Sequence, residues 1–270
     1  MFQFVAALLV FWTLSTVTSA EPRLALVVGN ADYRKLTPLK NPINDAMLVR
    51  KTLVTSGYDV DFITNATGSQ FKAGFSAFVE KRKAAGKSAT TIVYFAGHGI
   101  QVEGMNFLLP VDADMTTPSD VKRDAHNVGE MVEALEAIGG GSVTVLILDA
   151  CSNNPFASDL EIGKSRGLAR GDVVRTVEKS KISKPREYET DDLLIVLAAE
   201  PGTVALDGEG ENGPYVRALV KAIQQPKTDI RIALGRAREE VQNLTKGAQK
   251  SYMYGWLSGG VRTLGITEER

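Results

Sequence analysis

The chain has 270 residues, of which 44% are hydrophobic and 23% are charged. This is the composition of an ordinary globular protein, with enough apolar material for one sizeable core. Lys and Arg number 31, Asp and Glu number 32, and the formal net charge is -1. Such a balance gives no overall field that would attract nucleic acid, so we expect no nucleic-acid partner.

Residues 1–20 have the pattern of an export signal. The segment from Phe4 to Leu14 is almost unbroken apolar sequence, and the small residues Thr18 to Ala20 precede Glu21. This pattern predicts a secretory signal peptide that is cleaved before Glu21, and a mature protein that is periplasmic or secreted. The alternative is a short anchor that stays attached. Because the apolar run is shorter than the roughly 20 residues that span a bilayer, we expect no stable membrane insertion after cleavage.

Short apolar runs then alternate with amphipathic stretches. The runs are nearly continuous, as expected for strands buried on both faces. They are Leu24–Val28, Val60–Ile63, Thr91–Phe95, Val143–Leu148 and Leu193–Ala198. The stretches with helical spacing are Asn44–Ser56, Gln70–Ala85, Val128–Ile138, Pro214–Ile223 and Asp229–Leu244. This order predicts an α/β fold of three layers, in which a doubly wound, mainly parallel sheet has helices on both faces.

One segment, Ser158–Glu189, has no clean period and is rich in Lys and Arg. It predicts a long exposed basic loop, and loops of this length are usually functional or disordered. Two interpretations stay open, a solvated linker and a site of self-processing. We therefore expect one domain over residues 21–265, made of a larger part 21–157, a basic linker 158–190 and a smaller part 191–265. A signal peptide 1–20 precedes it, and a short tail 266–270 follows.

Polar residues follow two of the predicted strands. Ala96 to Gly99, with His98 at its centre, comes after one strand, and Asp149 to Ser152, with Cys151, comes after another. Ligands of an open parallel sheet bind outside the carboxyl ends of its strands. The chain has one Cys and two His, and the Cys and one His are thus expected at the same edge.

If the two strands are neighbours, their backbones lie about 4.8 Å apart, so an imidazole and a thiol at their ends can meet. An adjacent His can take the proton of a thiol and return it to a leaving amine. The pattern predicts His98 and Cys151 as a catalytic pair. The backbone N–H groups of Gly99 and Cys151 are the candidates for an oxyanion hole.

These residues resemble a known family. The segments Tyr94–Gly99 (YFAGHG), Gln101–Asp112 (QVEGMNFLLPVD) and Leu146–Cys151 (LILDAC) are similar to those of caspase-fold peptidases, and most like bacterial caspase-domain proteins. His98 precedes Cys151 by 53 positions, close to the interval of about 50 in caspases. Further marks are Val27–Tyr33, Asn41–Ala46, Ala198–Gly202, Asp207–Gly208 and Asn212–Gly213, so the resemblance covers about Arg23 to Arg262.

The resemblance implies a caspase-like fold and a cysteine-type endopeptidase that acts on peptides or proteins and needs no cofactor. Asp45 and Asp149 match the acidic residues of the primary specificity pocket of metacaspases and paracaspases, which implies cleavage after Arg or Lys. A carboxylate pair in a concave site favours a cationic side chain. The alternative for Asp45 is an ordinary first-turn carboxylate that interacts with the helix macrodipole.

Other signals were weaker. No compact Asp cluster has EF-hand spacing, and His98, His126 and Cys151 lack the short spacing of a zinc site, so we expect no metal. His126 is expected at the surface. The aromatic residues Tyr252, Tyr254 and Trp256 either line a substrate groove or pack the last strand. The rival functions are an inactive caspase-like binding or scaffold protein of the cell envelope, and a small-molecule hydrolase.

Overall fold

A computed structural model describes residues 21–102, 105–139, 143–151, 192–200, 205–208, 210–258, 260 and 262–265, without the side chains of Pro118 and Cys151. The predicted signal peptide, basic linker and tail lie outside these residues. The strands are β1 Arg23–Gly29, β2 Asp59–Thr64, β3 Thr90–Val102, β4 Met105–Leu108, β5 His126–Asn127, β6 Val143–Cys151, β7 Asp192–Leu197 and β8 Tyr252–Trp256. The helices are α1 Pro42–Thr55, α2 Gly68–Ala84, α3 Pro118–Asp124, α4 Val128–Glu136, α6 Pro214–Ile223 and α7 Ile230–Leu244.

The sheet has the strand order β2-β1-β3-β6-β7-β8. The pairs from β2 to β7 are parallel, and β8 is antiparallel to β7. The strand order reverses between β1 and β3, which is the switch point where ligands of such sheets bind. The loop that follows β1 and the end of β3 therefore lie on the two sides of this point.

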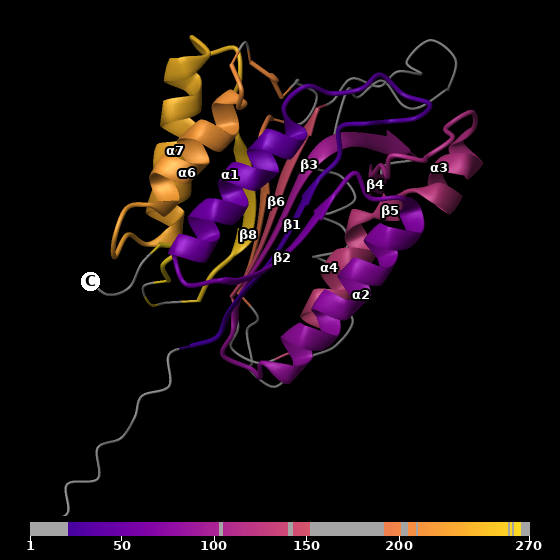
Figure 1. Ribbon diagram of the computed structural model, residues 1–270. Helices are drawn as coiled ribbons and strands as arrows, with labels where there is room; N and C mark the ends of the chain where they lie inside the picture. Colours follow the sequence, from indigo (N-terminus) through magenta and orange to yellow (C-terminus); the bar gives the residue numbers. More distant parts are fainter. Residues whose placement is uncertain are drawn as a thin grey trace, which may run out of the picture.

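Helices cover both faces of the sheet (Figure 1), which confirms the predicted three-layer α/β fold. Helices α1, α6 and α7 pack on one face, over Val27, Ile92 and Ile147 among others. Helices α2 and α4 pack on the other face, over Val28, Val93 and Leu148 among others. Because side chains alternate between the two faces of a strand, consecutive residues of one strand contribute to two separate hydrophobic cores.

Capping side chains and prolines stand at the starts of several helices. Thr67 and Gln70 form a capping box at the start of α2, and the Asn127 side chain accepts from the backbone N–H groups of Gly129 and Glu130 in α4. Pro42 and Pro214 stand at the starts of α1 and α6. These caps explain why the predicted helices begin within two residues of the observed ones.

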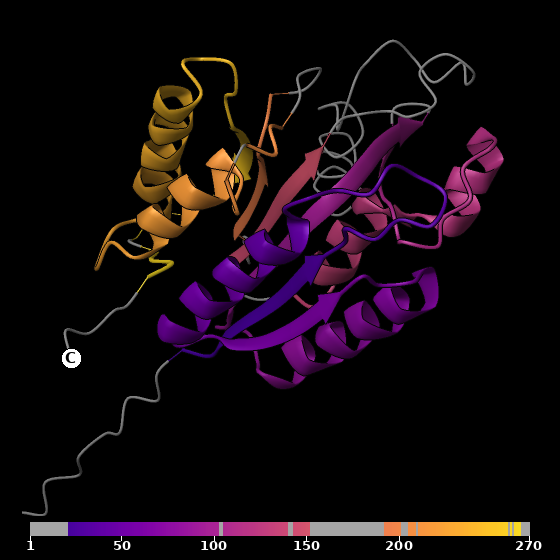
Figure 2. The same ribbon diagram turned by 45° about the horizontal axis from the view of Figure 1, so that its top comes forward.

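The strands that bear the candidate residues are longer than expected. β3 continues beyond Phe95 to Val102, and β6 continues beyond Leu148 to Cys151. The extension of β3 pairs with β4, which pairs with β5, and together with α3 these elements form a projection at one end of the sheet (Figure 2). The sequence did not predict β4, β5 or α3, because each is short. Phe107 of β4 and Val121 of α3 pack in a small third core. Among the described residues, no helix is long and apolar enough to cross a membrane.

Gly29 determines how closely α1 approaches β1. A Cβ atom at this position would lie 2.7 Å from the Ala46 Cβ and 2.7 Å from the Pro42 carbonyl oxygen. Since both atoms belong to a packed helix, we expect Gly29→Ala to lower the free energy of unfolding by about 1 to 3 kcal/mol. Urea unfolding measures the change.

Gly235, inside α7, is the matched control, because nothing lies within 4 Å of a Cβ built there. Gly235→Ala is expected to stabilise the protein by roughly 0.5 to 1 kcal/mol, as alanine does in an open helix position. Equal stability of the Gly29→Ala variant and the parent would show that α1 does not need this close approach.

Candidate active site

The last pair of the ladder between β3 and β6 brings two of the predicted residues together. The strands are parallel neighbours, and their ladder runs from Thr90 paired with Val143 to His98 paired with Cys151. Paired positions on neighbouring strands have backbones about 4.8 Å apart. The lone Cys of the chain and His98 are thus partners in register, although the Cys151 side chain lies outside the described part.

The alternation of each strand places the candidate residues on one face. Tyr94 and Ala96 of β3, and Val145 and Ile147 of β6, belong to the core under α1, α6 and α7. Because side chains alternate with a period of two, His98 and Asp149 belong to this same face. Asp149 is therefore one pleat away from Cys151, below the helix that carries Asp45.

A backbone carbonyl determines which nitrogen of the His98 imidazole carries the proton. His98 is 2% exposed, and its Nε2 atom lies 2.8 Å from the Thr37 carbonyl oxygen. A carbonyl only accepts, so Nε2 carries the proton and donates this hydrogen bond. In the neutral ring, the lone pair is then on Nδ1, which is the nitrogen that can act as a base.

The backbone of His98 determines the direction of the Gly99 N–H group. The His98 N–H donates to the Tyr33 hydroxyl, and the His98 carbonyl accepts from Leu109 N–H. Both groups thus lie on the β1 and β4 side of the strand. Consecutive residues of an extended strand direct their N–H groups to opposite edges, so Gly99 N–H lies on the β6 edge, where Cys151 is.

Asp45 connects α1 with the C-terminal part of the chain. It is 4% exposed, and its Oδ1 atom accepts from Asn212 Nδ2 at 2.8 Å and from Gly213 N–H at 3.0 Å. It stands in the first turn of α1 but makes no side-chain cap there. Burial raises the pKa of Asp45 to about 6, and these two hydrogen bonds lower it only in part.

Asp149 shares this buried region. The Tyr94 hydroxyl donates to Asp149 Oδ2 at 3.2 Å. Burial, followed by the charge of Asp45, raises the pKa of Asp149 well above its usual range, while part of its surface stays open to solvent. The carboxylate also raises the pKa of Tyr215, after burial, and the Tyr215 hydroxyl has no hydrogen-bond partner among the described residues. The structure therefore contains two close carboxylates with no cation paired to them in its described part.

A third acidic residue, Asp207, borders the same region. Its charge raises the pKa of Asp45 and of Asp149. Its side chain accepts from Lys40 N–H at 3.3 Å, and its carbonyl accepts from the Asn41 side chain. Sequence reasoning marked Asp207–Gly208 and Asn212–Gly213 only as family positions and gave them no role, because contacts over more than 160 residues have no local signal.

The raised pKa of Asp45 predicts a pH dependence of stability. The unfolded carboxyl titrates near 3.8 and the folded one near 6, so the folded state holds the proton more tightly. The stabilisation is complete below pH 3.8 and is lost as the pH rises through 6. We expect Asp45 to cost the folded protein about 3 kcal/mol at pH 7.5 relative to acidic conditions.

Urea unfolding of the parent and of Asp45→Asn at pH 4.5 and pH 7.5 tests this. The variant keeps an oxygen for Asn212 and Gly213, and we expect its gain in stability over the parent to be larger at pH 7.5 than at pH 4.5. Asp114→Asn, at an exposed position, is the control. A parent and an Asp45→Asn variant that respond identically to pH would contradict the burial of an ionisable group here.

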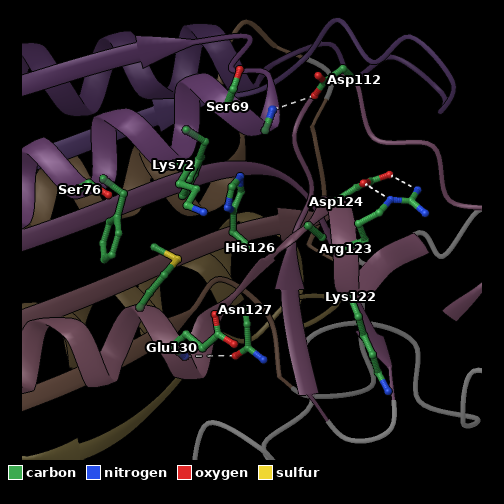
Figure 3. A pocket seen from close by; sticks show the side chains of 15 residues that line it. Ser69, Lys72, Ser76, Asp112, Lys122, Arg123, Asp124, His126, Asn127 and Glu130 are labelled. Carbon is green, nitrogen blue, oxygen red and sulfur yellow. Dashed lines mark hydrogen bonds and ion pairs between the residues drawn. The ribbon is translucent and has the colours of Figure 1, made fainter. Parts of the chain in front are cut away.

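A separate cavity of about 690 Å³ lies between α2, α4 and the end of α3 (Figure 3). It is on the sheet face opposite to His98. His126, expected at the surface, is half-buried there and stacks on Phe71 with ring centroids 4.1 Å apart. Burial lowers the pKa of His126 to about 4. The cavity wall has three basic and three acidic residues, namely Lys72, Lys122, Arg123, Asp112, Asp124 and Glu130, so it selects neither charge.

The open question about the last strand is answered by packing. Tyr252, Tyr254 and Trp256 of β8 pack against the core on the α2 and α4 face. Among the described residues, no group of three or more His, Cys, Asp or Glu side chains is placed to hold a metal ion.

The fold and the paired strand ends define an α/β protein with a histidine and a cysteine at the switch-point edge of a doubly wound sheet. The family model described as the caspase domain (Peptidase_C14) matches residues 22–259. The chain belongs to this family, whose members are cysteine peptidases.

Two curated relatives match part of this chain. The mucosa-associated lymphoid tissue lymphoma translocation protein 1 of Homo sapiens is 26% identical over 132 residues, which cover 49% of this chain and 15% of that protein. Its homolog in Mus musculus is 25% identical over 132 residues, with the same coverage. The match thus spans only a small part of these much longer proteins.

A solved structure shares the fold. The crystal structure of protein GSU0716 from Geobacter sulfurreducens has a TM-score of 0.60 to this chain at 14% identity, and covers 92% of this chain and 100% of its own. At this identity the likeness concerns the fold alone.

Proposed function

We propose that this protein is a cysteine endopeptidase that cleaves peptide bonds after Arg or Lys, with Cys151 as the nucleophile and His98 as its acid and base. One observation carries the proposal. His98 and Cys151 are the last register partners of the β3–β6 ladder, and His98 lies on the sheet face that holds Asp149 and is covered by the helix with the buried Asp45. Membership of a family of cysteine peptidases supports it.

The first half of the reaction transfers an acyl group to sulfur. His98 Nδ1 takes the thiol proton of Cys151, and the thiolate attacks the scissile carbonyl carbon. The backbone N–H groups of Gly99 and Cys151 hold the resulting oxyanion. As the C–N bond breaks, the imidazolium gives its proton to the leaving amine. The Thr37 carbonyl supports the imidazolium because it already accepts the Nε2 proton.

The second half restores the enzyme. A water molecule gives one proton to His98 Nδ1 and attacks the thioester carbonyl. The C–S bond then breaks, the new acid leaves, and the proton returns to the sulfur. No atom is required from a cofactor in either half.

The buried acids explain the proposed preference for a basic side chain. Asp45 and Asp149 hold their protons more tightly than usual because burial leaves their negative charge poorly solvated. A guanidinium or ammonium group at this place supplies the missing counter-charge and donates hydrogen bonds to both carboxylates. An acidic substrate side chain would add to the repulsion and be rejected.

The test is hydrolysis of short fluorogenic peptides that end in Arg, Lys, Leu or Asp before the reporter. We expect fast turnover of the Arg and Lys peptides, slow turnover of the Leu peptide and none of the Asp peptide. Binding of basic peptides without hydrolysis would favour the scaffold function instead. Turnover of the Asp peptide in preference to the others would contradict the proposed specificity.

A further inference from the structure

Tyr33 touches His98 in two ways that the proposed chemistry does not yet use. Tyr33 lies in the loop after β1 and is 5% exposed. Its ring centroid is 4.5 Å from that of the imidazole, with the two planes tilted by 54°. Its hydroxyl oxygen accepts the backbone N–H of His98 at 2.7 Å.

The Tyr33 hydroxyl takes the place of the backbone acceptor that a neighbouring strand would supply to His98. The ladder between β1 and β3 ends where Gly29 pairs with Ala96, two residues before His98. His98 N–H would therefore be buried without a strand partner, which costs roughly 1 to 3 kcal/mol when unsatisfied. The Tyr33 hydroxyl accepts this N–H and donates onward to the Leu109 carbonyl at 3.2 Å. Leu109 N–H in turn bonds the His98 carbonyl, so both backbone groups of His98 are held.

The surrounding residues leave room for this tyrosine. A Cβ atom on Gly97 would lie 2.5 Å from the Tyr33 hydroxyl, so the contact requires glycine next to the histidine. The same loop supplies Thr37, whose carbonyl accepts the Nε2 proton. This one loop thus makes three contacts with His98. The Tyr33 ring packs against the imidazole, the Tyr33 hydroxyl binds the backbone N–H, and the Thr37 carbonyl binds Nε2.

We propose that Tyr33 is a positioning residue that holds the His98 ring in the orientation required for proton exchange with Cys151. The proposal rests on the proposed function, since it assigns Tyr33 a part in the same His–Cys pair. Loss of the hydroxyl should let the end of β3 shift. Because small misplacements of reacting groups slow catalysis strongly, it should lower kcat more than it raises KM.

Tyr33→Phe tests the proposal, because it keeps the ring and removes only the hydroxyl. We expect kcat on an Arg peptide to fall roughly tenfold, with KM changed less than about twofold. The matched control is Tyr58→Phe, since the Tyr58 side chain is also buried and its hydroxyl has no partner among the described residues. The control should leave both constants unchanged.

Alkylation of the lone thiol by iodoacetamide, measured against pH, gives a readout that does not need peptidase activity. His98→Ala should move the midpoint of the alkylation profile up toward about 8.5, the pKa of a free thiol. Tyr33→Phe should move this midpoint part of the way. The control Tyr58→Phe should leave both the midpoint and the melting temperature unchanged. If Tyr33→Phe does not fold, a ring-difluorinated tyrosine at position 33 replaces it. Fluorine weakens the neutral hydroxyl as an acceptor and keeps the side chain in place, so kcat is compared at a pH below the pKa of the fluorinated phenol.

The outcomes separate the two proposals. A Tyr33→Phe variant with the parent's kcat and alkylation profile, beside a His98→Ala variant whose profile moves, would overturn the role of Tyr33 alone. A His98→Ala variant that alkylates as the parent does would overturn the His–Cys pair, and the role of Tyr33 with it.

Discussion

Replacing Cys151 by alanine, or His98 by alanine, is expected to lower kcat/KM on an Arg peptide by roughly 10³- to 10⁶-fold. Cys151 is the only cysteine of the chain, so no second thiol can take over. His98 is the residue paired with it across the ladder of β3 and β6. Since the two side chains act in one proton transfer, the double variant should be no slower than the worse single variant.

The matched control is His126→Ala, because His126 is the only other histidine and its ring stacks on Phe71 next to the remote cavity. This variant should keep its turnover even if its melting temperature falls slightly. Steady-state kinetics with equal amounts of folded protein measure all four variants. Retained activity in Cys151→Ala would mean that a different nucleophile or a contaminating peptidase is responsible.

Asp149→Asn is expected to lower kcat/KM for Arg and Lys peptides on the order of 10²- to 10³-fold, because it removes one of two buried charges that would face the cation. Asparagine has nearly the same shape and keeps an oxygen for the Tyr94 hydroxyl. The loss should therefore come from charge and not from packing. A peptide with Leu at the cleavage position is the internal control, and its slow turnover should change little.

The same substitution should stabilise the protein when no ligand is bound. Burial and the charge of Asp45 raise the pKa of Asp149, so the ionised carboxylate costs stability at neutral pH. We expect Asp149→Asn to raise the melting temperature at pH 7.5 but to lose the further rise that a peptide aldehyde ending in Arg gives the parent. An unchanged preference for Arg over Leu in this variant would remove Asp149 from the specificity pocket.

Much of the fold was predictable from local pattern. The five apolar runs fall within β1, β2, β3, β6 and β7 or extend one residue past them, and the five helical stretches match α1, α2, α4, α6 and α7. These runs are long and strongly apolar, so burial on both faces determines their structure. The two-residue β5 and the seven-residue α3 have no such apolar pattern. The pairing with β4 orders β5, and the capping box of Thr117 with Asp120 and the packing of Val121 order α3.

The sequence by itself determined the order of the strands and helices and the placement of His98 and Cys151 at one edge of the sheet. It could do so because hydrophobic period and short motifs are local properties of the chain. Asp45 and Asp149 became candidates only through the family resemblance. The tertiary structure decided the rest. Only folding brings Asp45 to Asn212 and Gly213, 167 and 168 positions away, and sets the Thr37 carbonyl and the Tyr33 hydroxyl against His98. Those contacts depend on the path of loops across the sheet edge, which long-range packing selects and which no local pattern encodes.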